Sequence, residues 1–231
     1  DPLLRNIFGQ KQNKIDISEL MDQGKLIFIN LSKGRIGEEN SSFFGSMFLT
    51  KIKQAGMERA SIPEAERREF YLYIDEFHNI VTQTFENILS EARKYALNLT
   101  IAHQYIGQLI PQVQHAVLGN TGSLICFRVG GEDAVKLKPE FEPLFGIKDL
   151  INLAVAEFYI KMTIDGESYD PFSAETLRVL PPTHPSYRQE ILDASRRKYS
   201  ISKGDAQKLI EEEEAMIIRS AEEKAIIESK A

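Results

Sequence analysis

Short apolar runs separated by amphipathic stretches make up most of the first 180 residues. Four runs have the length and composition of buried strands: 26–31, 70–75, 97–102 and 123–129. Two stretches between them carry apolar residues at helical spacing: about 40–56 and 84–95. A further strand is predicted at 158–164, followed by a hairpin turn at Asp165-Gly166.

The order of these elements predicts the fold class. Strands that alternate with helices, joined by right-handed crossovers, make a mostly parallel sheet flanked by helices. The sequence therefore predicts an α/β fold. In such a sheet the runs at 26–31 and 70–75 would be buried on both faces.

The character of the chain changes after about residue 173. Residues 180–183, Leu-Pro-Pro-Thr, break the pattern and are followed by a polar helix at 185–199 and an acidic segment up to Ala231. We divide the chain into residues 1–180 and a helical, acidic C-terminal extension, 181–231. The extension is interpreted as a solvated or frayed helix, with docking to a partner as the alternative.

Composition narrows the class of protein. The 231 residues are 42% hydrophobic and 27% charged, which is ordinary for a globular protein, and the net charge of −6 gives no general attraction to nucleic acid or membranes. The single cysteine, Cys126, lies in an apolar run and is predicted to be a buried thiol in a reducing compartment. No apolar segment is long enough to cross a bilayer. We expect a cytoplasmic chain that does not itself insert into the membrane, and its start at Asp1 suggests a piece of something longer.

Residues 70–76, Phe-Tyr-Leu-Tyr-Ile-Asp-Glu, are the most informative stretch. An apolar run ends in two adjacent carboxylates, and the carboxyl ends of strands in open α/β sheets are where ligands bind. This pattern is typical of the Walker B element of nucleotide-driven motors, in which the first acid holds Mg²⁺ through its water shell and the second activates water. The same pair also occurs as an ordinary strand end.

Gln104 follows the run at 97–102, one helix and one strand after Asp75. Successive crossovers bring both residues to the same edge of the sheet, so Gln104 is predicted to lie beside the acid pair. A neutral amide there can hydrogen-bond a γ-phosphate or its attacking water, as a sensor does. The alternative is an ordinary glutamine at the start of a helix.

Four stretches together resemble the second half of the motor domain of HerA–FtsK superfamily ATPases, in particular the TraG/TraD-like coupling proteins of type IV secretion and conjugation. They read FYLYIDEFHNI, ILSEARKYALNLTIAHQY, GNTGSLICFRVGGEDA and GKLIFINLSKGRIGEENSSFFGSMFLTKI. The resemblance covers roughly residues 5–180. It implies a RecA-like P-loop NTPase core, ATP and Mg²⁺ as cofactors, a homo-hexameric ring, and translocation of DNA without sequence preference. A relaxase or secretion-channel proteins are further partners that it implies, and the inner face of the cell membrane is the location for a longer parent protein.

The resemblance also implies roles for single residues. Asp75 and Glu76 take the two Walker B roles, with Asp75 holding Mg²⁺, and Gln104 takes the sensor role. Arg93 matches the arginine that such rings insert into a neighbouring subunit's nucleotide site, although a surface ion pair with Glu91 or Glu86 is the simpler interpretation of it.

Three basic residues complete the candidate set. Arg128, at the end of the run 123–129, is a candidate for phosphate or subunit contact. Lys33 and Arg35, in the loop after the first run, are candidates for DNA-backbone contact, with a subunit interface as the alternative. The basic group at 196–198 is interpreted as the solvated face of a helix. His78 receives no catalytic role.

One motif is missing from the sequence. No Gly-x-x-x-x-Gly-Lys-Ser/Thr occurs, so the chain has no phosphate-cradling Walker A loop. In the family that loop lies upstream, on another strand. We therefore interpret the chain as the Walker B and sensor half of the domain, which alone should bind ATP weakly and hydrolyse none.

Three functions stay open from the sequence. The first is part of an ATP-driven pump for DNA or DNA–protein complexes in conjugation or type IV secretion. The second is a HerA-like translocase that works with a nuclease at DNA ends. The third is a non-catalytic scaffold that kept the fold for assembly or docking.

Overall fold

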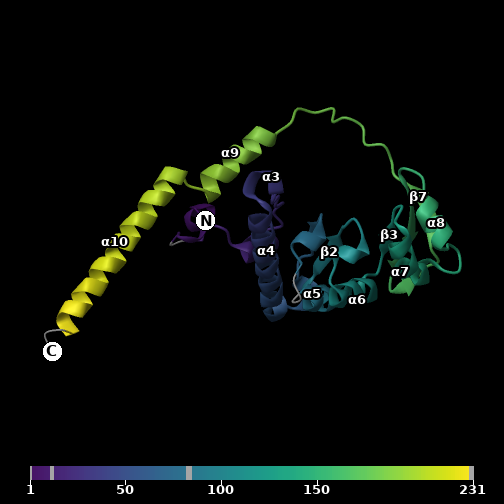
Figure 1. The fold of residues 1–231 in the computed structure, drawn as a ribbon, viewed down its shortest axis with the longest axis horizontal. Coiled ribbons are helices and arrows are strands. Elements are labelled where there is room, and N and C mark those ends of the chain that lie inside the picture. The colour runs from purple at the N-terminus through teal and green to yellow at the C-terminus, as the bar shows by residue number, and fades with distance from the viewer. Residues whose placement is uncertain (1, 11–12, 82–84, 229–231) are drawn as a thin grey trace. The chain divides into compact units, whose positions relative to one another are not determined.

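The computed structural model describes residues 2–10, 13–81 and 85–228. The chain forms two compact units, one of residues 17–180 and one of residues 1–16 together with 181–231 (Figure 1). The mixture of helices with a parallel strand pair confirms the predicted α/β class.

The unit 17–180 holds all the strands, which are β1 (Phe70–Ile74), β2 (Leu97–Ile101), β3 (Leu124–Cys126), β4 (Glu157–Lys161), β5 (Thr163–Ile164), β6 (Glu167–Ser168) and β7 (Phe172–Glu175). Its α-helices are α2 (Ile17–Asp22), α3 (Lys33–Ile36), α4 (Glu38–Glu58), α5 (Phe85–Glu91), α6 (Pro111–Asn120), α7 (Gly131–Phe141) and α8 (Ile147–Asn152). Short 3-10 turns connect them: η1 (Arg59–Ser61), η2 (Glu64–Glu66), η3 (Phe77–Asn79), η4 (Ala92–Tyr95) and η5 (Ile106–Gln108).

The strands form three small sheets among the described residues. β1 and β2 are parallel, as predicted, and β3, β4 and β7 form an antiparallel sheet. β5 and β6 form the predicted hairpin, whose turn residues Asp165 and Gly166 both have positive φ. The expected run of parallel strands is thus realised only in β1 and β2.

The prediction that the strand at 70–75 is buried on both faces is wrong. Tyr71 and Tyr73 are 56% and 72% exposed, and they lie opposite the exposed Asn98 and Thr100 of β2. The other face holds the buried or half-buried positions, ending in Ile74. The aromatic side chains of the run thus lie on a face that the described residues leave exposed.

The predicted buried strand at 26–31 is also wrong. The segment belongs to no strand ladder, and Leu26 and Phe28 are 88% and 85% exposed. Alternate residues Ile27 and Leu31 are half-buried, so the segment keeps one inward side but lacks backbone pairing with a described strand. Apolar composition alone could not distinguish this unpaired segment from a central strand.

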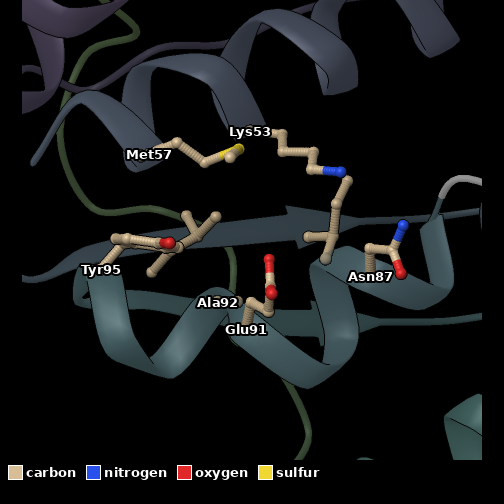
Figure 2. A pocket seen from close by; sticks show the side chains of 9 residues that line it. Lys53, Met57, Asn87, Glu91, Ala92 and Tyr95 are labelled. Atoms are coloured by element: carbon tan, nitrogen blue, oxygen red, sulfur yellow. The ribbon is translucent and has the colours of Figure 1, made fainter. Parts of the chain in front are cut away.

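The predicted helices at 40–56 and 84–95 are confirmed as α4 and as α5 continued by η4, while residue 84 itself lies outside the described residues. Figure 2 shows Lys53 and Met57 of α4 facing Glu91, Ala92 and Tyr95 of α5 and η4. The pocket between them is only about 10 Å³, room for about one water molecule. Among the described residues, the side chains of this helix pair are close-packed and leave no room for a ligand larger than water.

Arg59 ties the first half of this unit together. Its side chain is 2% exposed and pairs with Asp22 of α2, with an Nη2–Oδ1 distance of 2.9 Å. Its Nη1 donates to the carbonyl oxygens of Arg68, just before β1, and of Tyr95, at the end of η4. One guanidinium thus fixes the start of both parallel strands.

A second core lies around β3, α7 and α8. Its buried members are Ile106, Cys126, Ala134, Leu137, Phe141 and Leu150. Cys126 is a buried free thiol, as predicted. β3 is shorter than the predicted run at 123–129, and Arg128 therefore lies in the loop that follows it.

The other unit consists of α1 (Pro2–Phe8), α9 (Arg188–Tyr199) and α10 (Lys203–Glu228). Arg5 of α1 forms an ion pair of 2.7 Å with Glu214 of α10, and Ala206 and Ile210 of α10 are buried. The C-terminal segment is thus helical, as expected. No helix in the described part of the chain is both long and apolar enough to cross a membrane.

Candidate functional site

The carboxyl ends of β1 and β2 are joined beyond the strands themselves. The Ala102 N–H donates to the Ile74 carbonyl at 2.8 Å, and the Phe77 N–H donates to the Ala102 carbonyl at 2.9 Å. These two bonds extend the parallel ladder into the loops after both strands. The residues that follow β1 and β2 are therefore held against each other by backbone contacts.

Glu76 has an unusual backbone conformation at this edge. Its φ of 50° and ψ of 41° are left-handed, which for a residue with a side chain costs roughly 1 kcal/mol or more. The turn sends Phe77 into the core, where its ring is fully buried and lies 4.6 Å from that of Phe85. Burial of Phe77 thus stabilises a conformation that leaves the carboxylates of Asp75 and Glu76 at the surface.

The structure brings Glu76 and Gln104 together. Gln104 Nε2 donates to Glu76 Oε1 at 3.0 Å. Asp75 lies next to them with an exposed carboxylate, whose Oδ1 accepts the Glu76 N–H at 2.9 Å. An acid pair and an amide thus share one edge of a parallel sheet, as the order of the elements predicts.

His78 and Gln108 extend this polar group, and sequence reasoning gave neither of them a part. His78 Nε2 lies 3.2 Å from Gln108 Nε2 and 3.6 Å from Glu76 Oε2. Its Nδ1 is buried and has no hydrogen-bond partner among the described residues. The sequence signal for His78 was its position two residues after the acid pair, but no pattern pointed to Gln108.

A buried carboxylate holds the loop that carries Gln104 and Gln108. Asp133, in the first turn of α7, is buried, and its Oδ2 accepts the Ile106 N–H at 2.9 Å. Gln108 Oε1 in turn accepts the Tyr105 N–H at 3.2 Å. Asp133 belongs to the stretch Gly-Gly-Glu-Asp, which is part of one of the four stretches that resemble the family. The resemblance did not reveal that Asp133, which lies by the second core, supports this loop.

A cavity of about 150 Å³ opens beside Gln104. Its walls come from the loop after β2 and from β3 with the loop that follows, and they include His103, Arg128, Asp133 and Cys126. Burial lowers the pKa of His103, with a further lowering by His78. Burial also raises the pKa of the Cys126 thiol to about 11, helped by the Asp133 charge. The structure thus places Arg128 at the same cavity as Gln104.

Arg93 lies on η4, away from the acid pair. Its side chain is exposed, and within the described ranges it forms no ion pair with Glu91 or Glu86. The simpler interpretation as a surface ion pair therefore gains no support. The role in a neighbouring subunit's site stays a prediction.

Lys33 and Arg35 lie in α3, a single helical turn where the sequence predicted a loop. Lys33 Nζ donates to Glu38 Oε1 at 2.6 Å and to Asn79 Oδ1 at 2.8 Å, and this contact lowers the pKa of Glu38. Lys33 is thus tied to the turn after Glu76, and the exposed Arg35 is the more available cation of the two.

The donors near Glu76 suit a magnesium ion bound with a nucleotide. Mg²⁺ keeps most of its water and is usually held by one or two carboxylates together with substrate phosphates. Asp75 offers such a carboxylate: it is exposed, and its Oδ2 accepts no hydrogen bond from the described residues. A group of three or more His, Cys, Asp or Glu that could hold a metal without phosphates does not occur in the part of the chain that the structure describes.

Solved structures with a similar fold carry nucleotides. The plasmid coupling protein TrwB in complex with ADP and Mg²⁺ matches 74% of this chain with a TM-score of 0.59 and 14% identity. TrwB in complex with the non-hydrolysable ATP analogue ADPNP matches 74% with a TM-score of 0.55 and 15% identity. The chain spans 45% of the length of these TrwB chains. At this identity the likeness establishes the fold alone, which is the fold of the matched part of these TrwB structures. No protein-family model and no curated protein sequence matches the chain.

Proposed function

We propose that this chain is the hydrolytic part of an ATPase that moves DNA, or DNA with attached protein, in conjugation or type IV secretion. The observation that carries the proposal is the 3.0 Å hydrogen bond from Gln104 to Glu76 at the carboxyl edge of the parallel strands. It joins a water-activating acid to a phosphate-sensing amide, the two groups that NTP hydrolysis needs near the γ-phosphate. The TrwB structures with this fold hold ADP with Mg²⁺ or ADPNP, which supports ATP and Mg²⁺ as the ligands.

The different surroundings of Asp75 and Glu76 suit them to different roles. Glu76 is half-buried, and its side chain is held by Gln104, so it is suited to orient a water molecule and accept its proton. Asp75 is exposed and would hold Mg²⁺ through its water shell. The ion would supply positive charge to the phosphates.

The loop that binds most of the ATP phosphates has to come from residues outside this sequence. A phosphate-binding loop normally follows a strand of the same sheet. Among the described strands, β2 pairs only with β1 and β3 only with β4, and the cavity beside Gln104 lies between them. A parallel strand added along the free edge of β2 would end beside Gln104 and Arg128, so its loop would lie near the proposed γ-phosphate position.

Arg93 enters the proposal as a residue that acts on a neighbouring subunit. It is exposed and lies on η4, which precedes β2, whereas Glu76 follows the carboxyl end of β1. An arginine donated across a ring interface can stabilise the charge of the transferring phosphoryl group. Lys33 and Arg35 are proposed as weak, sequence-independent contacts to DNA phosphates.

The test is a comparison of nucleotide binding with turnover in a protein that joins this chain to a phosphate-binding loop. Glu76→Gln keeps the size of the side chain and removes the base. Turnover is expected to fall by at least about a hundredfold, as for loss of a general base, while ATP affinity stays within about threefold. Gln112→Leu, on the exposed side of α6, is the control and should change neither. Unchanged turnover in Glu76→Gln would contradict the proposal.

A further inference from the structure

The hydrogen bonding of His78 depends on one ring nitrogen, Nε2. Nδ1 is buried without a partner among the described residues, so nothing at that end favours either neutral tautomer. Nε2 faces two groups: the amide nitrogen of Gln108 at 3.2 Å and Glu76 Oε2 at 3.6 Å. The first separation allows a hydrogen bond and the second exceeds one.

The orientation of Gln108 determines which way the bond to His78 runs. Gln108 Oε1 accepts the Tyr105 N–H at 3.2 Å, so the group that faces the imidazole is the NH₂ donor. The ring nitrogen Nε2 must then be the acceptor, and the proton of neutral His78 lies on Nδ1. In this tautomer His78 has no hydrogen to donate to Glu76.

We propose that Gln108 is a positioning residue that keeps His78 from pairing with Glu76. This inference rests on the proposed function, because it concerns the availability of Glu76 as the base. Gln104 already occupies Oε1, and Oε2 is the oxygen left to receive the proton of the attacking water. Without the Gln108 amide, the His78 proton moves to Nε2, and a small rotation of the ring closes the 3.6 Å gap to Oε2. Both carboxylate oxygens are then occupied, and Glu76 becomes a weaker base.

The imidazole tautomer can be measured in this chain as it stands. Nitrogen-15 NMR of the histidine rings at pH 8 reports which nitrogen carries the proton, and the chain has only four histidines to assign. We expect the Nδ1–H form for His78 in the wild type and the Nε2–H form in Gln108→Met, which nearly preserves side-chain volume. An Nε2–H form in the wild type, or the same tautomer in both proteins, would overturn the inference.

The turnover rate of the ATPase-competent protein provides a second test, in which one substitution should lower kcat and a second should raise it again. Gln108→Met is expected to lower kcat by roughly three- to tenfold, the effect of about one added hydrogen bond, with KM within about twofold. Adding His78→Leu to it should restore kcat towards the wild-type value, because the competing donor is gone. A merely structural role for Gln108 predicts that the double variant is no better than the single one, and that result would overturn the inference.

Failure of the proposed function and failure of the Gln108 role give different experimental results. A wild-type protein without Glu76-dependent turnover would overturn the proposed function and with it the role of Gln108. An active wild type whose double variant shows no recovery would overturn the role of Gln108 alone. Thermal unfolding of each variant, with Gln112→Leu as the matched control on the exposed side of α6, identifies any loss caused by misfolding.

Discussion

Replacing Arg59 by methionine should destabilise the part of the molecule that presents Glu76 and Gln104. Methionine has a similar length and is apolar, so it can fill much of the buried volume while offering no hydrogen-bond donor. The change removes the donor from the carbonyls of Arg68 and Tyr95 and from the carboxylate of Asp22. These acceptors lie before β1, at the end of η4 and on α2.

The expected cost follows from how well each acceptor can find water. Loss of the 2.8 Å bond leaves the Arg68 carbonyl without its donor, at about 1–3 kcal/mol, while the 3.4 Å bond to Tyr95 contributes less. Asp22 is 50% exposed and can be hydrated again, so its ion pair adds only about 0–1 kcal/mol. The sum is roughly 1–4 kcal/mol, which for a domain of this size lowers Tm by about 2–16 °C.

Urea unfolding followed by far-UV circular dichroism measures this difference directly. The m-value should stay constant, which shows that the two-state comparison holds. Arg35→Met, the same substitution at an exposed arginine of α3, should stay within about 0.5 kcal/mol of the wild type. An Arg59→Met protein as stable as the Arg35→Met control would refute the view that this guanidinium holds the strand starts.

Three further outcomes are expected. Ala96 has a left-handed φ of 53°, so Ala96→Gly should raise the free energy of unfolding by about 0.5 kcal/mol. Glu76→Gly should instead be about as stable as the wild type, because relief of backbone strain offsets the lost hydrogen bond from Gln104, and urea midpoints measure both changes. Burial raises the pKa of the Cys126 thiol to about 11 from 9.0, so the stability that the protonated thiol contributes is complete below about pH 9 and is lost as the pH rises to 11. The difference in unfolding free energy between the wild type and Cys126→Ala should therefore shrink by roughly 2–3 kcal/mol over that interval. In the proposed ring, an equal mixture of Arg93→Ala and Glu76→Gln subunits should recover ATPase turnover at roughly one interface in four, since only there do an intact Glu76 and an intact neighbouring Arg93 meet. Turnover no higher than that of either variant alone would argue against a role for Arg93 across the interface.

The elements that depend on local periodicity could be predicted from sequence. α4 carries apolar residues at helical spacing, and the run at 97–102 has apolar residues at 97, 99 and 101, so both were identified. The meeting of Glu76 with Gln104 followed from topology, because a right-handed crossover returns successive strand ends to one edge.

The predictions that were wrong, and the residues that were missed, depend on neighbours that composition does not reveal. Leu26 and Phe28 have the character of core residues, yet no described strand pairs with their segment. Gln108 and Asp133 act through single hydrogen bonds between distant parts of the chain, to His78 and to the Ile106 N–H. Neither residue stands in a pattern that periodicity or motif spacing can detect.

The exposed face of β1 and the polar group at its end point to the same physical requirement. Tyr71 and Tyr73 alternate with inward residues and lead directly to Asp75, so they share its side of the strand. A ligand held by Asp75 would therefore lie beside the uncovered side, where the exposed Asp75 carboxylate is open to water. The proposed hydrolysis through Glu76 would need water excluded except for one molecule, and an added layer over both tyrosines would help to exclude it. The same layer would remove both tyrosine rings from solvent, so its binding and the assembly of a competent site are expected to be one event.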